Sequence, residues 1–287
     1  MRKPRCVAPP GACDTHLHVY GPVEIYPLAA ERNYTPNPHS TLDDYLQLHR
    51  SLGLERAVIV TGSANGTNNQ ITFDALQRMK GGFKGLALLD PAISDSALIK
   101  LKEGGFTGFR IKANGKGGLS FVDSAKIAER VRGWDWHVEF MSESMAEVIS
   151  VVPFLNKLRL PYVFDHVAHA EPGQTGAAGA FRELLAILKS EERVWINLYS
   201  FYQSSKTGPP DYQDMIGVVR SIVEARPNRV IWGSNWPHAG IAVPMPHDAD
   251  LLDFLLSAAP EDKLRNPILA DNPATLYGWS QTSNSEH

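Results

Sequence analysis

The chain has 287 residues, of which 43% are hydrophobic, and its formal net charge is −3 at pH 7. This size suits one α/β barrel of about 250 residues, so we expect a single domain over 1–287 with a frayed polar tail at 281–287. The slight acidic excess and the lack of any Lys/Arg run argue against nucleic acid or a membrane surface as the partner. A small-molecule ligand fits this composition better.

The cysteine content and the N-terminal residues bear on the cellular compartment. Only Cys6 and Cys13 are present, in no metal-binding spacing, so a disulfide framework is not expected. No apolar run approaches the ~18 residues of a membrane span, and the start of the chain lacks an apolar signal region. We therefore expect a cytoplasmic protein, with a homo-oligomer as one open possibility.

Short apolar runs recur along the chain, each followed by a stretch with helical spacing. This alternation is typical of βα units around a parallel sheet. The expected strands lie at 12–16, 57–61, 85–89, 108–112, 137–141, 162–166, 194–198 and 230–233. Helices are expected, for example, at 42–51, 67–79, 144–157, 180–189, 212–225 and 248–257. Eight such strands favour an α/β fold of the (β/α)8 TIM-barrel type. A doubly wound open sheet is the alternative, but it usually has a glycine-rich turn after its first strand, and 14–18 contains no glycine.

Two segments are longer than a minimal βα repeat requires. Residues 19–40 are rich in Pro, Tyr and Asn and follow the first strand, and we expect them to lie over the mouth of the barrel. Residues 201–211 form a second polar segment after the seventh strand, which we expect to be a loop.

Histidines cluster where strands of the predicted barrel end. Alternation along the first strand places Asp14, His16 and His18 on one face, and His166 ends the sixth strand. In this fold the carboxyl ends of the strands carry metal ligands or acid/base groups. A pair of hydrogen-bonded structural histidines is the competing interpretation, and the third histidine makes it less attractive.

Further histidines and tyrosines are candidate substrate contacts. His169 follows the sixth strand, where it can recognise an anion or be solvated, and His238 follows the eighth, where it can orient the loop. Tyr34, Tyr199 and Tyr202 are candidate hydrogen-bond donors, although packing roles are equally open.

Cationic side chains mark the end of the fourth strand. Arg110 and Lys112 lie on it and Lys116 follows, which suits a substrate carboxylate. Burial of Arg110 requires an anionic partner, either the substrate or a structural carboxylate, whereas an Arg that reaches the rim does not. On the fifth strand Glu139 and Met141 alternate, and the sequence leaves open which of them faces the barrel centre.

Together, these segments resemble the lactonase branch of the amidohydrolase superfamily (amidohydrolase 2 type), which includes 2-pyrone-4,6-dicarboxylate lactonases, sulfomuconolactone hydrolases and galactarolactone isomerase. The resemblance spans nearly the whole chain. The segments that carry it lie at 11–18, 32–36, 164–166, 232–238 and 271–279.

The resemblance implies a single-domain, distorted (β/α)8 barrel that acts on the carbonyl of a small acidic lactone. In such an enzyme His16, His18 and His166 would surround and polarise that carbonyl. Some members of the branch use zinc, and these three histidines would then be its ligands. Other members use none.

The substrate contacts that the resemblance implies come from several strands. Arg110 and Lys116 correspond to groups that hold substrate carboxylates, and Ser63 and Tyr34 to further contacts. His169 stands where the dicarboxylate lactonase has an arginine, so the manner of anion recognition differs here.

Residue 235 departs from the hydrolytic pattern. Hydrolytic members have an aspartate there, which acts as general base for water and, where a metal is bound, as a ligand. Asn235 cannot take a proton near neutral pH and adds no charge to a metal site. Galactarolactone isomerase resembles this chain in having asparagine, and there a substrate hydroxyl replaces water as the acceptor.

Three hypotheses follow from these residues. The first is lactone hydrolysis or isomerisation, with His16, His18, His166 and Asn235 as the catalytic set. The second is a zinc-dependent decarboxylase of the same superfamily, against which Asn235 counts. The third is a ligand-binding barrel without catalysis. Neutral histidines and an amide compensate the charge of Zn²⁺ poorly, so we expect that no cofactor is required, with Zn²⁺ as the alternative.

Overall fold

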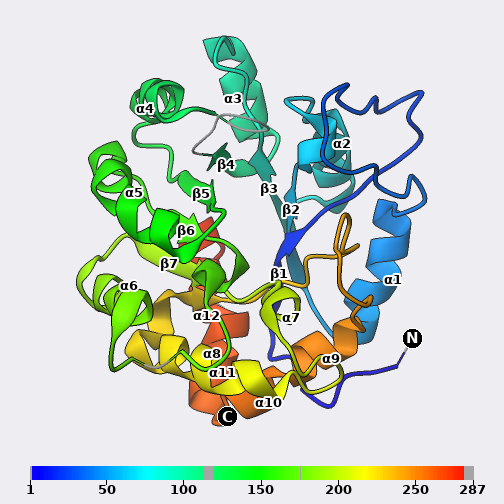
Figure 1. Cartoon of the computed structure of the whole chain (residues 1–287). Helices are drawn as coiled ribbons and strands as arrows, with labels where there is room; N and C mark the ends of the chain where they lie inside the picture. Colours follow the sequence, from blue (N-terminus) through cyan, green and yellow to red (C-terminus); the bar gives the residue numbers. More distant parts are fainter. Residues whose placement is uncertain (1, 113–118, 175, 281–287) are drawn as a thin grey trace.

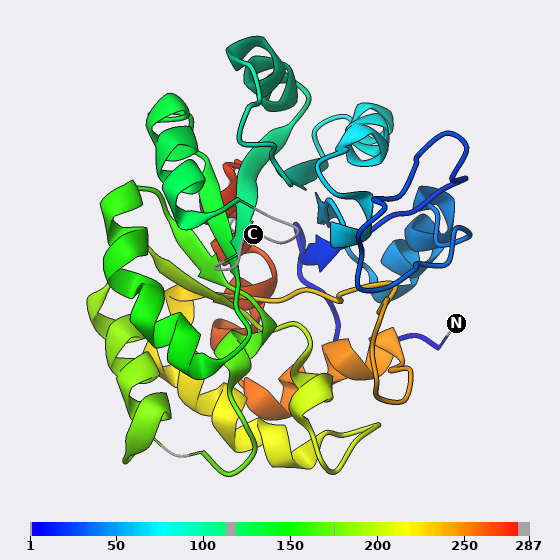
Figure 2. The same cartoon turned by 45° about the horizontal axis from the view of Figure 1, so that its top comes forward.

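Eight parallel strands follow one another around a barrel in the computed structural model, which describes residues 2–112, 119–174 and 176–280 (Figure 1). Helices lie outside the strands, as the second view also shows (Figure 2). The strands are β1 (Cys13–Leu17), β2 (Arg56–Val60), β3 (Phe83–Ala87), β4 (Phe106–Lys112), β5 (His137–Met141), β6 (Tyr162–Phe164), β7 (Val194–Asn197) and β8 (Val230–Ile231). The predicted α/β barrel is confirmed, and each predicted strand is found within two residues of its expected ends.

The helices of the described residues include those that the spacing predicted. They are α1 (Leu42–Leu52), α2 (Gln70–Met79), α3 (Asp95–Glu103), α4 (Phe121–Arg130), α5 (Met145–Leu158), α6 (Gly179–Ser190), α7 (Phe201–Ser204), α8 (Gln213–Ala225), α9 (Asp248–Asp253), α10 (Leu255–Ala258), α11 (Asp262–Leu269) and α12 (Asp271–Tyr277), with 3₁₀ turns η1 (Ser63–Asn65), η2 (His166–His169) and η3 (Pro227–Arg229). Two expectations need correction. The segment 201–211 contains the short helix α7, and the single helix expected at 248–257 is divided into α9 and α10. None of the helices in the described part is both long and apolar enough to cross a membrane.

Helix α1 illustrates how sequence signals set the outer layer. Thr41 caps its N-terminus in a capping box with Asp44, and Gly53 ends it in the left-handed conformation, at φ 73°. The side chains that α1 buries recur at helical spacing: Leu42, Tyr45, Leu48, His49 and Leu52. This face of the helix therefore packs on the barrel.

Side chains on the strands alternate between the barrel interior and the helix layer. On β2, Val58 and Val60 belong to the inner apolar cluster, whereas Ala57 and Ile59 belong to the cluster that includes the helices. On β4 and β5 the outward members are Phe109, Ile111, Val138 and Phe140. Arg110 and Glu139 therefore point inward, which answers the question that the sequence left open for the fifth strand.

The barrel closes where β8 returns beside β1. His16 O accepts from Asn235 N at 2.8 Å, and His18 N donates to Trp236 O at 2.8 Å. One isolated bridge joins Leu17 to Trp236. We call this contact the closing seam. It joins the sequence motif at 11–18 to the one at 232–238.

A β-bulge in β1 changes the direction of Asp14. Asp14 pairs with Ala57 and Leu17 with Ile59, so β1 has one more residue than β2 over this interval. Asp14 accepts hydrogen bonds from the Tyr45 hydroxyl of α1 and from Ser234, while the His16 ring meets Glu139 inside the barrel. The prediction that Asp14 and His16 share one face is therefore wrong, because the extra residue interrupts the alternation.

Candidate active site

Arg110 lies between two buried carboxylates at the carboxyl ends of the strands. Its Nε is 2.8 Å from Glu139 Oε1 and its Nη2 is 3.9 Å from Asp165 Oδ2. The three side chains are at most 5% exposed. Buried charges of this kind persist only when they are paired, so the carboxylates explain why an arginine is tolerated on an inward-facing strand position. Two carboxylates against one guanidinium leave the trio with a formal charge of −1.

Each of these carboxylates also faces a histidine. Glu139 Oε2 lies 3.1 Å from His16 Nδ1, and Asp165 Oδ2 lies 3.7 Å from His166 Nδ1. The order of contacts across the site is therefore His16, Glu139, Arg110, Asp165, His166. The His16 imidazole on β1 and the His166 imidazole after β6 thus each face a carboxylate, and the two carboxylates share one guanidinium.

The ring nitrogens of His16 and His18 have defined roles. Burial, with the charge of Arg110 as a further cause, lowers the pKa of His16 well below its usual value, and burial lowers that of His18 in the same way. Both rings are then neutral at pH 7. Because Glu139 and the Val60 carbonyl, 2.8 Å from His18 Nδ1, only accept hydrogen bonds, the proton of each ring lies on Nδ1. Each histidine therefore keeps an unprotonated Nε2.

Tyr199 contacts both His16 of β1 and His166, which follows β6. Its ring stacks on His16 at 3.8 Å between centroids and meets His166 edge-on at 4.9 Å. Burial and the nearby carboxylates of Asp165 and Glu139 raise the pKa of Tyr199 well above 10. The hydroxyl thus remains protonated and is a hydrogen-bond donor within the site.

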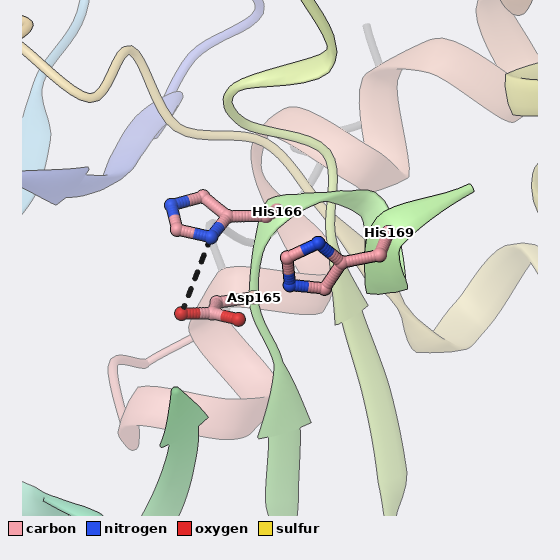
Figure 3. A group of neighbouring side chains, drawn as sticks. All are labelled: Asp165, His166 and His169. Carbon is pink, nitrogen blue, oxygen red and sulfur yellow. Dashed lines mark ion pairs between the residues drawn. The ribbon is translucent and has the colours of Figure 1, made fainter. Parts of the chain in front are cut away.

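The sixth strand ends earlier than the sequence suggested, at Phe164, and a left-handed turn follows. His166, Val167, Ala168 and His169 all have φ between 46° and 54°, each costing roughly 1–2 kcal/mol for a residue other than glycine. The turn brings the side chains of His166 and His169 close to that of Asp165 (Figure 3). Strain of this kind persists where the surrounding structure requires it, often at functional sites.

Only one trio of possible metal ligands is gathered within 4.8 Å in the described residues, namely Asp165, His166 and His169 (Figure 3). It shares only His166 with the histidine trio that the resemblance implied. The set fits a dication poorly, since the Arg110 guanidinium lies beside Asp165, with Nη2 3.9 Å from Oδ2, and its positive charge opposes a cation there.

Asn235 meets Tyr202 and Ser200 at the closing seam. Its φ of 63° is a left-handed conformation that asparagine tolerates better than most residues. Its Nδ2 donates to Ser200 Oγ at 2.9 Å and to the Tyr202 hydroxyl at 3.0 Å. The Tyr202 hydroxyl also lies 2.9 Å from His238 Nδ1. Three of the predicted site residues are thus joined in one network.

The other predicted contacts lie around this centre. Lys112 forms an ion pair with Glu143 at 3.0 Å, and the Tyr34 hydroxyl bonds to that of Tyr20 at 2.9 Å. Ser63 begins η1, directly after β2. Lys116 lies outside the described residues, so its role stays a prediction.

Several residues that shape the site were not assigned a role from the sequence. Glu139 and Asp165 hold the buried charges, and Ser200 and Asp248 belong to the network of Asn235. An acidic residue in an otherwise apolar strand was the available signal for Glu139. Asp248 gave no such signal, because an acidic residue in the first turn is ordinary for a helix.

The chain belongs to the amidohydrolase family, whose sequence model matches residues 13–279. It is 35% identical to 4-sulfomuconolactone hydrolase of Hydrogenophaga intermedia, over 96% of this chain and 91% of that protein. It is 29% identical to D-galactarolactone isomerase of Agrobacterium fabrum, over 96% of this chain and 94% of the relative. A ligand-free crystal structure from Agrobacterium tumefaciens superposes with a TM-score of 0.85 at 28% identity, covering 97% of this chain and 100% of the other. The fold and the family indicate an enzyme.

Proposed function

We propose that this enzyme isomerises a small acidic lactone by passing the acyl group from one oxygen of the substrate to another. Asn235 is the observation that carries this proposal, because an amide accepts a hydrogen bond from a hydroxyl but cannot take the proton of attacking water. The relative named D-galactarolactone isomerase supports it. Hydrolysis is the second candidate, supported by the higher identity to a protein named as a lactone hydrolase.

The histidines supply the proton transfer that the proposal requires. The attacking hydroxyl of the substrate loses its proton to an unprotonated Nε2, on His16 or His18, as its oxygen bonds to the lactone carbonyl carbon. The ring C–O bond then breaks, and the departing oxygen takes up the proton from that histidine, which returns to its neutral form. Burial disfavours the protonated ring, and the nearby carboxylates of Glu139 and Asp165 offset part of that cost at His16.

Cationic groups near the end of β4 suit the acidic part of the substrate. Lys112 has a solvent-exposed partner, Glu143, whose side chain is 62% exposed, so a substrate carboxylate can compete for the ammonium group. Arg110 already has two buried carboxylate partners, so we assign the substrate carboxylate to Lys112 rather than to Arg110. His166, 36% exposed in its side chain, is the most accessible of the three catalytic histidines.

We also propose that the reaction needs no metal. The poor fit of the Asp165, His166 and His169 set to a dication supports this, as does the amide at position 235. If zinc were bound, it would supply Lewis-acid polarisation of the carbonyl, with His16, His18 and His166 as the candidate ligands.

A product analysis tests the reaction type. Aldarolactones and muconolactone or pyrone carboxylates are incubated with the enzyme, and ring size is followed by NMR. The proposal predicts a second lactone without accumulation of the open diacid; rapid release of diacid would instead support the hydrolase. Asn235→Asp is expected to gain hydrolysis because it restores a base for water. Asn228→Asp, an exposed change of the same chemistry in η3, is the matched control and should have no effect.

The cellular setting is a further part of the proposal. We propose a cytoplasmic enzyme whose partner is a small molecule rather than nucleic acid or membrane. The net charge of −3 supports the partner class, and the free thiols of Cys6 and Cys13 suit a reducing compartment. Cell fractionation tests the location, and light scattering tests whether a homo-oligomer forms.

A further inference from the structure

A chain of hydrogen bonds runs from Asp248 on α9 to Asn235 at the closing seam. Asp248 Oδ1 lies 3.0 Å from His238 Nε2, and His238 Nδ1 lies 2.9 Å from the Tyr202 hydroxyl. That hydroxyl lies 3.0 Å from Asn235 Nδ2. His238 is 3% exposed and Tyr202 is 2% exposed, so protein groups rather than water satisfy them.

The direction of each hydrogen bond follows from the group at the outer end. The Asp248 carboxylate only accepts, so Nε2 of His238 carries the hydrogen, and in the neutral ring Nδ1 is an acceptor. The hydroxyl of Tyr202 has one hydrogen, which it donates to Nδ1. Its oxygen must then accept from residue 235, which requires a donor there.

Asparagine meets this requirement and aspartate does not. Both amide hydrogens of Asn235 are used, one toward Tyr202 and one toward Ser200 Oγ. The remaining atom, Oδ1, is free to accept a hydrogen bond from the substrate. With an aspartate at position 235, the hydrogen of Tyr202 would turn toward the new carboxylate, and His238 Nδ1 would lose its donor.

We propose that Asp248, His238 and Tyr202 are positioning residues that fix the orientation of the Asn235 amide, with Oδ1 directed to the substrate hydroxyl. The network thereby specifies an amide at the position that decides between a hydroxyl and water as acceptor. The effect that we expect on the reaction rests on the isomerase function proposed above. The orientation of the Asn235 amide rests on the hydrogen bonds alone.

The tautomer of His238 tests the orientation without any substrate. In protein carrying ¹⁵N-labelled histidine, His238 is expected to show its proton on Nε2 and an acceptor-type Nδ1 signal. Tyr202→Phe should shift the Nδ1 signal of His238, and Asn235→Asp should perturb it as well. A proton on Nδ1, or a doubly protonated ring at neutral pH, would overturn the proposed direction of the chain.

The effect on the reaction is tested with a graded pair at position 248. Asp248→Ala removes the acceptor, and the mispositioned amide is expected to lower kcat for isomerisation by about 10- to 100-fold, with little change in KM. Asp248→Asn should recover a large part of the rate, because its amide oxygen still accepts from Nε2. Tyr162→Phe is the control, since it removes a tyrosine hydroxyl that bonds to Asn156 in another part of the fold.

The outcomes distinguish a failure of the positioning role from a failure of the proposed isomerase function. Unchanged kcat in Asp248→Ala, or equal losses in the Ala and Asn variants, would contradict a positioning role. A wild-type enzyme that isomerises no lactone would contradict the proposed function, while the NMR measurement would still decide whether the amide is held as described.

Discussion

Glu139 and Arg110 form an ion pair inside the barrel, with 2.8 Å between Oε1 and Nε, and their side chains are 0% and 5% exposed. The pair joins β4 to β5 at the end where the histidines gather. It supports both the stability of the barrel and the orientation of His16, so the two effects can be measured on one variant.

Glu139→Gln is expected to lower the free energy of unfolding by about 1–3 kcal/mol, because Arg110 loses its carboxylate partner at 2.8 Å and keeps only Asp165 at 3.9 Å. Activity should fall further than the loss of folded protein explains, since His16 loses a carboxylate acceptor. Urea unfolding and the specific activity of the folded fraction measure these effects. Glu129→Gln is the control: its ion pair with Arg132 is on the surface, and both quantities should stay near wild type.

Gly233→Ala is expected to disturb His16 directly. A Cβ at this glycine would lie 2.8 Å from the backbone nitrogen and the Cβ of His16, so the first strand must shift. We expect a loss of about 1–3 kcal/mol in unfolding free energy and a clear loss of kcat.

The matching control for this variant is Gly217→Ala, where nothing lies within 4 Å of the added carbon. It lies inside α8, so alanine should stabilise the protein by up to about 1 kcal/mol without an effect on rate. Equal activity of the two variants would show that the contact with His16 has no role in catalysis.

Asp214 should make the segment after α7 sensitive to acid. Burial acts to raise its pKa, but hydrogen bonds from Ser205, Lys206 and Thr207 outweigh it and lower the pKa to about 2. The native state therefore binds this proton less readily than the unfolded state, whose pKa is about 3.9. The stabilisation is complete above about pH 4–5 and declines as pH falls toward 2. Unfolding free energies of wild type and Asp214→Asn, measured from pH 6 to pH 3, should converge at the acidic end, whereas Asp211→Asn, an exposed change in the same segment, should show no such trend.

Removal of metal tests the proposed independence from zinc. Protein treated with a strong chelator and then dialysed is expected to retain its activity, and elemental analysis of untreated protein should find zinc well below one equivalent per chain. Activity that disappears with the chelator and returns with added zinc would falsify the metal-free mechanism.

The barrel could be predicted from the sequence because its evidence is repeated along the chain. Each apolar run and each helical spacing is a local pattern, and the fold follows from their alternation. The positions of His16, His18 and His166 at the carboxyl ends of strands followed from the same reasoning.

The directions of individual side chains could not be predicted with the same certainty. The bulge in β1 turns Asp14 toward α1 and Ser234. No local sequence pattern predicts the extra residue in this strand. Glu139 and Met141 are related by strand alternation, so only the packing of Val138 and Phe140 against the helices decides that Glu139 points inward. The network from Asp248 to Asn235 joins α9, α7 and the segment after β8, which are separate in the sequence. Contacts between such segments have no local sequence pattern.

The closing seam makes the integrity of the barrel and that of the candidate site depend on the same hydrogen bonds. The backbone of Asn235 bonds to that of His16, although most of the chain separates the two residues. A fragment that ends before β8 would carry the histidines of the first strand without this contact. A barrel that is open at this seam therefore has no intact site.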